Sequence, residues 1–278
     1  MKVFFLVASL VTLTGCSLLT RQTGQSIERS TQITPSPEPT PYQTYSAPEI
    51  ETKEVYIIAL LGDSMMEALG PLGGPFSEKL GNLYQNQDII VDNYSVGSTN
   101  ILSIDERLRK ELSSGQWSFK PLIQRDDIDL IVVGSFAYNP LSHITDRKEA
   151  LETQNKALTD LMMTIEKEMP QTKVVFLSTI APSKEFFGKS LNLDPEKRLI
   201  QVQERKEYLA NHIAFANKHS IPVIDVYHES LNENGDGNLE YINPDDFIHP
   251  SAVGVDVISS QMAEFIYDNN ILPRKVQN

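Results

Sequence analysis

The chain has 278 residues, a net charge of −13 and one cysteine, Cys16. The negative charge argues against a nucleic-acid-binding protein, which must neutralise phosphates with Lys and Arg, and against charge-driven binding to an anionic membrane. A single cysteine excludes an intrachain disulfide. The hydrophobic fraction of 40% and the charged fraction of 22% are those of an ordinary globular protein.

Residues 1–15 have the pattern of an export signal. Lys2 is followed by the apolar run VFFLVASLVTL, which is too short to span a bilayer, and the run leads into LTGC. This ending resembles the bacterial lipobox. The resemblance implies cleavage before Cys16, a diacylglyceryl group on its sulfur, and an exported protein anchored to a membrane of the bacterial envelope. An ordinary signal peptide with a chance cysteine, or a core helix, is the alternative.

Residues 16–54 are rich in Ser, Thr, Gln and Pro and show no apolar periodicity. Such a segment cannot bury enough apolar surface to offset the entropy of ordering, so it is predicted to be a flexible tether. The folded domain is then expected to span residues 55–272, with a short tail at 273–278. A domain of this size can bury a full core.

Within this domain, short apolar segments alternate with longer amphipathic ones. The apolar segments are rich in Val and Ile, as in parallel strands that are buried on both faces. They predict strands at 55–61, 89–94, 129–136, 173–180 and 221–226. Helical periodicity predicts helices around 76–86, 150–168, 196–218 and 251–267. The alternation predicts an α/β fold, a three-layer α/β/α sandwich around a parallel five-stranded sheet.

Ligands of such open sheets bind beyond the carboxyl ends of the strands. The first strand leads into Gly62-Asp63-Ser64. A Ser hydroxyl is a weak nucleophile unless a base, usually a His held by a carboxylate, takes its proton. Asp246 and His249 are three residues apart just before the last helix. Ser64 could also be a turn residue and His249 a surface residue near a helix cap, but their joint placement favours a nucleophile and its base.

The motifs GDSM (62–65) and DFIH (246–249) resemble those of the SGNH, or GDSL, hydrolases, which are esterases, lipases and carbohydrate deacetylases on a flavodoxin-like sheet. The resemblance implies Ser64 as the nucleophile, with Asp246 and His249 completing the triad. It also implies the backbone N–H groups of Ser64 and Gly97 as donors to an oxyanion. It implies no metal and no organic cofactor.

The third motif of that family departs from its usual form in this chain. The family pattern is G-x-N-D, whose Asn side chain donates to the oxyanion, but Phe136 stands at the matching distance from Gly134. We assign the role to Asn139, the next Asn in GSFAYNP. Ser135, Asn100 or a backbone group are the alternatives.

Three other features carry weaker indications. Asp63 is expected to bind the backbone of its turn rather than to take part in chemistry. Residues 232–243 partly match a calcium-binding loop, but their twelfth position is Asn243 instead of Glu, which favours a polar turn. Phe186 and Phe187 form either a wall or lid of the site or a loop packed on the sheet rim.

Together these features predict an exported, lipid-anchored serine esterase that forms an acyl-enzyme on an ester substrate. Short acyl or O-acetyl groups on an envelope glycan are the expected substrate. A lipase, a lysophospholipase or an acyltransferase would use the same site. A non-catalytic glycan-binding lipoprotein is the alternative from another class; the unusual third motif supports it, and the retained Ser, Asp and His argue against it.

Overall fold

The computed structural model describes residues 42–275. The predicted export signal, Cys16 and the first part of the predicted tether lie outside the described residues. Among residues 42–275, no helix has both the length and the apolar character that crossing a bilayer requires.

Five parallel strands form the central sheet, in the order β2-β1-β5-β6-β7. They are β1 (Val55–Leu61), β2 (Asp88–Asn93), β5 (Leu130–Gly134), β6 (Lys173–Ser178) and β7 (Val223–Asp225). All five predicted strands are therefore present. From β1 the chain moves to one side to form β2 and then returns to the other side to form β5. The strand order thus reverses between β1 and β5, which is where ligands bind in open sheets.

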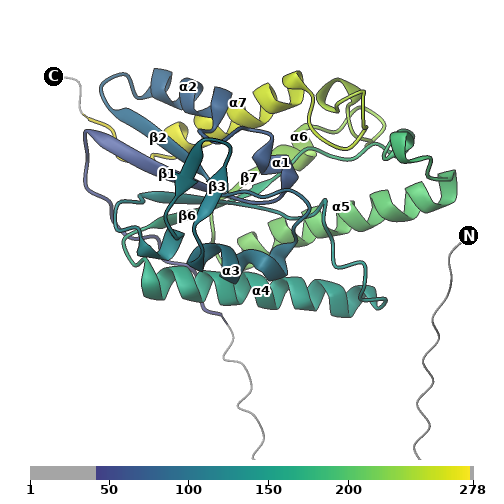
Figure 1. Ribbon diagram of the computed structural model, residues 1–278, viewed down its shortest axis with the longest axis horizontal. Coiled ribbons are helices and arrows are strands. Elements are labelled where there is room, and N and C mark those ends of the chain that lie inside the picture. The colour runs from purple at the N-terminus through teal and green to yellow at the C-terminus, as the bar shows by residue number, and fades with distance from the viewer. Residues whose placement is uncertain (1–41, 276–278) are drawn as a thin grey trace, which may run out of the picture. The chain divides into compact units, whose positions relative to one another are not determined.

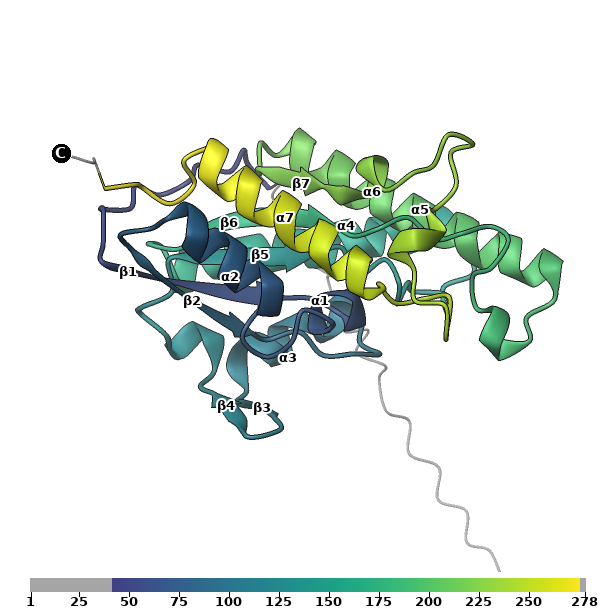
Figure 2. The ribbon, with the colours of Figure 1, turned by 90° about the horizontal axis from the view of Figure 1, so that it is seen from above.

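Helices cover both faces of this sheet, which gives the predicted three layers (Figure 1). The helices α2 (Gly74–Leu83) and α7 (Ala252–Asp268) lie side by side on one face (Figure 2). The two long helices α4 (Arg147–Glu168) and α5 (Pro195–Lys218) cover the other face. The predicted α/β sandwich is confirmed.

Because side chains alternate along a strand, each face of the sheet has its own apolar core. Ala59 and Leu61 of β1 pack in the cluster that includes residues of α4 and α5. Ile58 and Leu60 pack in the other cluster, with residues of α2 and α7. All four side chains are fully buried. The central strand is therefore fixed from both sides, and so is the position where it ends.

Several short elements join these layers. They are the helices α1 (Ser64–Glu67), α3 (Ile104–Arg109) and α6 (Val226–Glu229), the antiparallel hairpin of β3 (Leu112–Ser114) and β4 (Trp117–Phe119), and the 3-10 turns η1 (Ile101–Ser103), η2 (Leu122–Gln124), η3 (Lys189–Leu191) and η4 (Leu239–Tyr241). Neither α3 nor the hairpin is predicted above, because three-residue strands and a six-residue helix are too short to show a period.

The predicted start of the folded domain at Val55 is wrong. Tyr45 is buried, its N–H donates to the carbonyl of His219 at 2.7 Å, and its hydroxyl oxygen accepts from the N–H of Val174 at 2.8 Å. These contacts fix the chain at the amino end of β6. Residues 42–54 are therefore part of the domain, although their composition alone predicts a tether.

The predicted tail also packs on the domain where it is described. The carbonyl of Pro273 accepts from the hydroxyl of Tyr56 at 2.7 Å and from the side-chain amide of Gln87 at 3.1 Å. The N–H of Lys275 donates to the Gln87 side chain at 3.1 Å. The domain therefore extends beyond residue 272.

We expect Tyr45→Ala to lower the free energy of unfolding by about 3 kcal/mol, because it removes a buried aromatic ring and leaves the Val174 N–H without its acceptor. Urea unfolding followed by circular dichroism measures this change. Thr52→Ala, at an exposed position of the same segment, is the control and should change stability by less than about 0.5 kcal/mol. Equal midpoints for the two variants would show that the segment does not stabilise the domain.

Candidate active site

Ser64 is the first residue of α1, directly beyond the end of β1. The side chain of Asp63 caps this helix, since its Oδ1 accepts from the N–H of Met65 at 3.0 Å. The turn needs a glycine at position 62, because a Cβ there would lie 2.5 Å from the Cγ of Met66. Strand, turn and cap thus place the Ser64 side chain at the carboxyl edge of the sheet, where it is partly exposed.

The structure brings Ser64 together with two residues that lie far along the sequence. Its Oγ is 3.0 Å from Nε2 of His249, at a separation of 185 residues. The Nδ1 of His249 is 2.7 Å from Oδ2 of Asp246. Both distances are within the range of a hydrogen bond. A hydroxyl, an imidazole and a carboxylate therefore lie in one continuous chain of contacts.

The surroundings of Asp246 favour its ionised form. Burial alone would raise the pKa of this carboxyl, but hydrogen bonds from the His249 ring and from the N–H groups of Ile248 and His249 outweigh it, so the pKa lies below its usual value. An ionised Asp246 accepts a hydrogen bond from the N–H at Nδ1 of His249. The other ring nitrogen, Nε2, is then free to accept from Ser64.

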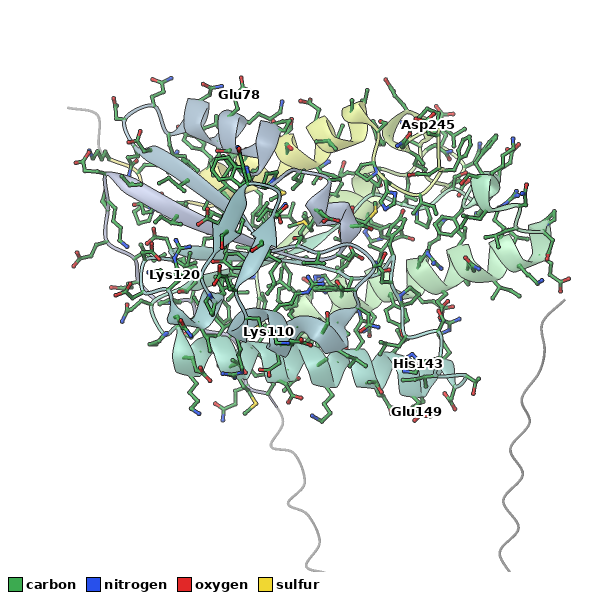
Figure 3. The ribbon with its side chains drawn as sticks, viewed as in Figure 1. Glu78, Lys110, Lys120, His143, Glu149 and Asp245 are labelled. Atoms are coloured by element: carbon green, nitrogen blue, oxygen red, sulfur yellow. The ribbon has the colours of Figure 1, made fainter. Side chains whose placement is uncertain are left out.

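The loop that carries Asp246 and His249 is held at both ends. The N–H of Asn243 donates to the carbonyl of His249 at 2.8 Å, and Ser251 caps α7 by accepting from Gly254 at 3.0 Å. Asp245, labelled in Figure 3, marks this loop beside the first turn of α7.

Phe247, between the two triad residues, has a φ of +56°, in the left-handed region that non-glycine residues rarely adopt. Its ring stacks on that of Phe186, with the centroids 5.4 Å apart. Phe187, in contrast, is buried and packs near Tyr138. Of the two phenylalanines, Phe186 therefore contacts the catalytic loop and Phe187 belongs to the core.

Gly97 lies beside Ser64, as the resemblance implies, but its N–H already has a partner. It donates to Oε2 of Glu67 at 2.9 Å. A Cβ at position 97 would lie 2.6 Å from that oxygen and 3.4 Å from the Cβ of Ser64. Position 97 therefore lies between Glu67 and the nucleophile, with no room for a side chain while Glu67 stays in place.

Asn139 also reaches the turn that carries the nucleophile. Its side-chain amide donates to Oδ2 of Asp63 at 3.2 Å, which uses one of its two protons. The preceding loop is folded back by Phe136, whose φ is +53°, and by a hydrogen bond from the Asn139 N–H to the Phe136 carbonyl. This turn explains how an Asn three residues later than the family spacing reaches Asp63, the residue before Ser64.

The two side-chain alternatives to Asn139 have other hydrogen bonds. Asn100 caps η1 by accepting from the N–H of Leu102 at 3.1 Å. Ser135 is buried, and its hydroxyl accepts from the N–H of Ala137 at 3.4 Å. Neither has a contact with Asp63 or Ser64 among the hydrogen bonds of residues 42–275. Asn139 is thus the best placed of the three.

Asp63 therefore binds both the turn backbone and Asn139, as a structural residue of the site. It is 2% exposed. Burial raises its pKa, while hydrogen bonds from Met65 and Asn139 and the nearby charge of Arg107 oppose that shift. The prediction that Asp63 binds the backbone of its turn is confirmed.

Sequence reasoning missed Arg107 of α3. Its guanidinium donates to the carbonyl of Gly62 at 2.7 Å and to that of Val96 at 3.1 Å, so it ties the Ser64 turn to the Gly97 loop. Burial lowers its pKa to about 10, and the charges of Asp63 and Glu67 oppose the shift. It was missed because α3 itself shows no sequence signal.

A second Asp–His pair was also missed. Asp225 and His228 have the same spacing as Asp246 and His249, and Nδ1 of His228 lies 2.6 Å from Oδ2 of Asp225. The spacing is visible in the sequence, so it cannot by itself identify the base. Of the two histidines, His249 is the one whose ring contacts Ser64.

The loop at residues 232–243 is a polar turn, as predicted. The carboxylate of Asp236 accepts from the N–H of Lys184 at 2.8 Å and lies 3.6 Å from Nζ of Lys206. Its oxygens are thus used by protein donors. Over residues 42–275, no group of three or more His, Cys, Asp or Glu side chains is arranged to hold a metal ion.

No family model and no curated protein matches the chain. Solved structures do. A protein of Parabacteroides merdae described as a GDSL-like lipase has a TM-score of 0.56 at 12% identity, with 81% of this chain and 100% of that chain covered. A protein of Bacteroides fragilis assigned as an acylhydrolase has a TM-score of 0.51 at 16% identity, covering 82% and 92%.

A third structure, assigned to a lipolytic protein of the G-D-S-L family from Desulfitobacterium hafniense, has a TM-score of 0.50 at 12% identity and covers 75% of this chain and 98% of that chain. At these identities the likeness shows the fold. The chain therefore has the fold of these structures, and its activity has to be argued from the site.

Proposed function

We propose that this protein is a serine esterase of the SGNH/GDSL type. The observation that carries the proposal is the chain of contacts from Ser64 through His249 to Asp246, with 3.0 Å and 2.7 Å between the atoms concerned. The solved structures of similar fold support it, since they are described as lipases and acylhydrolases.

In the first step, Ser64 Oγ attacks the ester carbonyl while Nε2 of His249 takes the hydroxyl proton. The imidazole then carries a positive charge, which the ionised carboxylate of Asp246 stabilises. As the tetrahedral intermediate collapses, His249 gives its proton to the leaving alcohol. The acyl group stays on Ser64 as an ester.

The negative oxygen of the tetrahedral intermediate needs donors close to Ser64. The N–H of Ser64 lies at the start of α1, where the first N–H groups have no acceptor within the helix. The second proton of the Asn139 amide and the N–H of Gly97 complete the proposed set. Loss of one such donor typically costs about 3 kcal/mol of activation free energy.

In the second step, water attacks the acyl-enzyme. His249 accepts a proton from this water and returns it to Ser64 Oγ as the acid leaves, so that the free enzyme is regenerated. An alcohol in place of water would give acyl transfer at the same site.

The finer proposal concerns location and substrate. The lipobox-like ending at Cys16 supports an exported, lipid-anchored enzyme of the bacterial envelope, and such an enzyme meets envelope glycans and lipids. We therefore propose short acyl or O-acetyl groups on a glycan as the substrate. A lipase or lysophospholipase is the alternative, and acyl chain length distinguishes the two.

Ser64→Ala is expected to lower kcat for p-nitrophenyl acetate by at least about a thousandfold, because no other group can form the acyl-enzyme. Ser113→Ala, at an exposed position of β3, is the control. Equal rates for Ser64→Ala and the wild type would refute the serine esterase.

The same assay with longer acyl chains tests the substrate: rates that rise with chain length would favour a lipase.

Asn139→Ala is expected to lower kcat by about 100- to 1,000-fold, because it removes one oxyanion donor. The matched control is Asn100→Ala, which removes only the cap of η1. Steady-state kinetics and an unfolding curve should be recorded for both. An unchanged kcat for Asn139→Ala, together with a loss for Asn100→Ala, would give the role to Asn100.

Cys16→Ser is expected to release the protein from membranes, because the substituted side chain cannot carry the thioether-linked lipid. Fractionation of cells that express the wild-type and the variant chains, followed by immunoblotting, measures the change. A variant that stays in the membrane fraction would count against lipidation at this residue.

A further inference from the structure

Glu67 occupies a position that the proposed reaction needs. It is the last residue of α1 and lies one helical turn beyond Ser64, so both side chains lie on the same side of the helix. Its Oε2 accepts from the N–H of Gly97 at 2.9 Å. This N–H is one of the donors proposed for the oxyanion.

The carboxylate and the oxyanion compete for the same place. A single N–H makes its best hydrogen bond to one acceptor, and two negative charges at hydrogen-bond distance from it repel each other strongly. The carboxylate is also close to the nucleophile. A Cβ built on Gly97 would lie 2.6 Å from Glu67 Oε2 and 3.4 Å from the Cβ of Ser64. The Glu67 carboxylate must therefore move as the tetrahedral intermediate forms.

The structure permits this movement without a change of the backbone. The side-chain amide of Asn93, which is buried, donates to the carbonyls of Met66 and Gly70, both at 2.9 Å, and so holds the chain on either side of Glu67. The Glu67 side chain itself is exposed. Rotation about its own bonds can free the Gly97 N–H while Ser64 stays in place.

The charges around Glu67 decide where its carboxylate rests. The guanidinium of Arg107 is the nearby positive group, but both its terminal nitrogens donate to backbone carbonyls. Asp63 and Asp246 are the acidic groups of the site, and His249 lies beside Ser64. A displaced Glu67 therefore stays at the mouth of the site as an exposed negative charge.

We infer that Glu67 is the residue that sets the charge of the ester this site accepts. Substrates that are neutral, or that carry a cation able to pair with the displaced carboxylate, are favoured. Substrates that carry an anion near the ester bond are rejected, because they bring a second negative charge to the mouth of the site. This inference rests on the proposed function and narrows its substrate class.

The experiment uses three acetyl esters of one phenol ring: methyl 4-acetoxybenzoate, which is neutral, 4-acetoxybenzoate, which is anionic, and 4-acetoxy-N,N,N-trimethylanilinium, which is cationic. Glu67→Gln keeps the length and one acceptor oxygen but removes the charge. Glu67→Ala removes the charge and the acceptor oxygen. Glu78→Ala, on the outer side of α2 (Figure 3), is the matched control, since Glu78 is also an exposed glutamate on a helix.

For each ester the ratio of kcat/KM between variant and wild type cancels the intrinsic reactivity of the ester. On the anionic ester we expect both Glu67 variants to gain at least about tenfold. On the neutral ester we expect a gain of about three- to tenfold for Glu67→Ala and less for Glu67→Gln, which keeps an acceptor for Gly97. On the cationic ester both Glu67 variants should have a lower kcat/KM than the wild type. Glu78→Ala should leave all three ratios within about twofold of one.

Ratios that are the same for all three esters would overturn the inference, even if Ser64→Ala proves the esterase itself. A uniform loss in both Glu67 variants would assign Glu67 to support of the Gly97 loop instead. If the wild type is inactive on the neutral ester, activity of Glu67→Ala on that ester supports the inference, provided that adding Ser64→Ala to this variant removes the activity. If every chain is inactive on the neutral ester, the proposed function fails and takes this inference with it.

Discussion

The site depends on the hydrogen bonds that the buried carboxylate of Asp63 accepts. One of its oxygens caps the helix that begins with Ser64, and the other accepts from the amide of Asn139. A carboxylate with so little exposure is stable only if its oxygens have partners. The same requirement that keeps Asp63 satisfied therefore fixes Ser64 and the side chain of Asn139 in one arrangement.

The remaining groups of the site reach this centre from other strand ends. His249 and Asp246 come from the loop before α7, Gly97 from the loop after β2, and Arg107 ties that loop to the turn before Ser64. The two apolar cores pack on both faces of β1, so the loops extend from a strand whose position is fixed. The backbone is left-handed at Phe247, in the loop before α7, and at Phe136, in the loop after β5 that carries Asn139, as is common where a fold presents reactive groups.

The sequence was informative where the physical signal is local. Consecutive Val and Ile residues predicted all five strands, and a Ser after the first strand with an Asp–His pair before the last helix predicted which residues meet. It was misleading at residues 42–54, because a polar composition does not reveal that one tyrosine, Tyr45, is buried.

Contacts between separate loops could not be predicted in this way. The hydrogen bond from Gly97 to Glu67 and the two from Arg107 depend on how loops from different strands approach each other. The position of Asn139 depends on a positive φ at a phenylalanine, which residue propensities do not predict. Asp225 and His228 show that a sequence pattern can also occur away from the site. They have the same spacing as Asp246 and His249, but it is His249 that contacts Ser64.

The attachment of Tyr45 also determines how the domain bears mechanical load. Tyr45 joins the domain at the start of β6, the amino edge of the parallel sheet, whereas Ser64 follows the carboxyl end of β1. A force applied through the preceding chain would therefore act first on Tyr42, whose hydroxyl donates to Glu166 at 2.7 Å and whose ring stacks on Phe215, and then on the two hydrogen bonds of Tyr45. These contacts would yield before the spacing of Ser64 and His249 is disturbed.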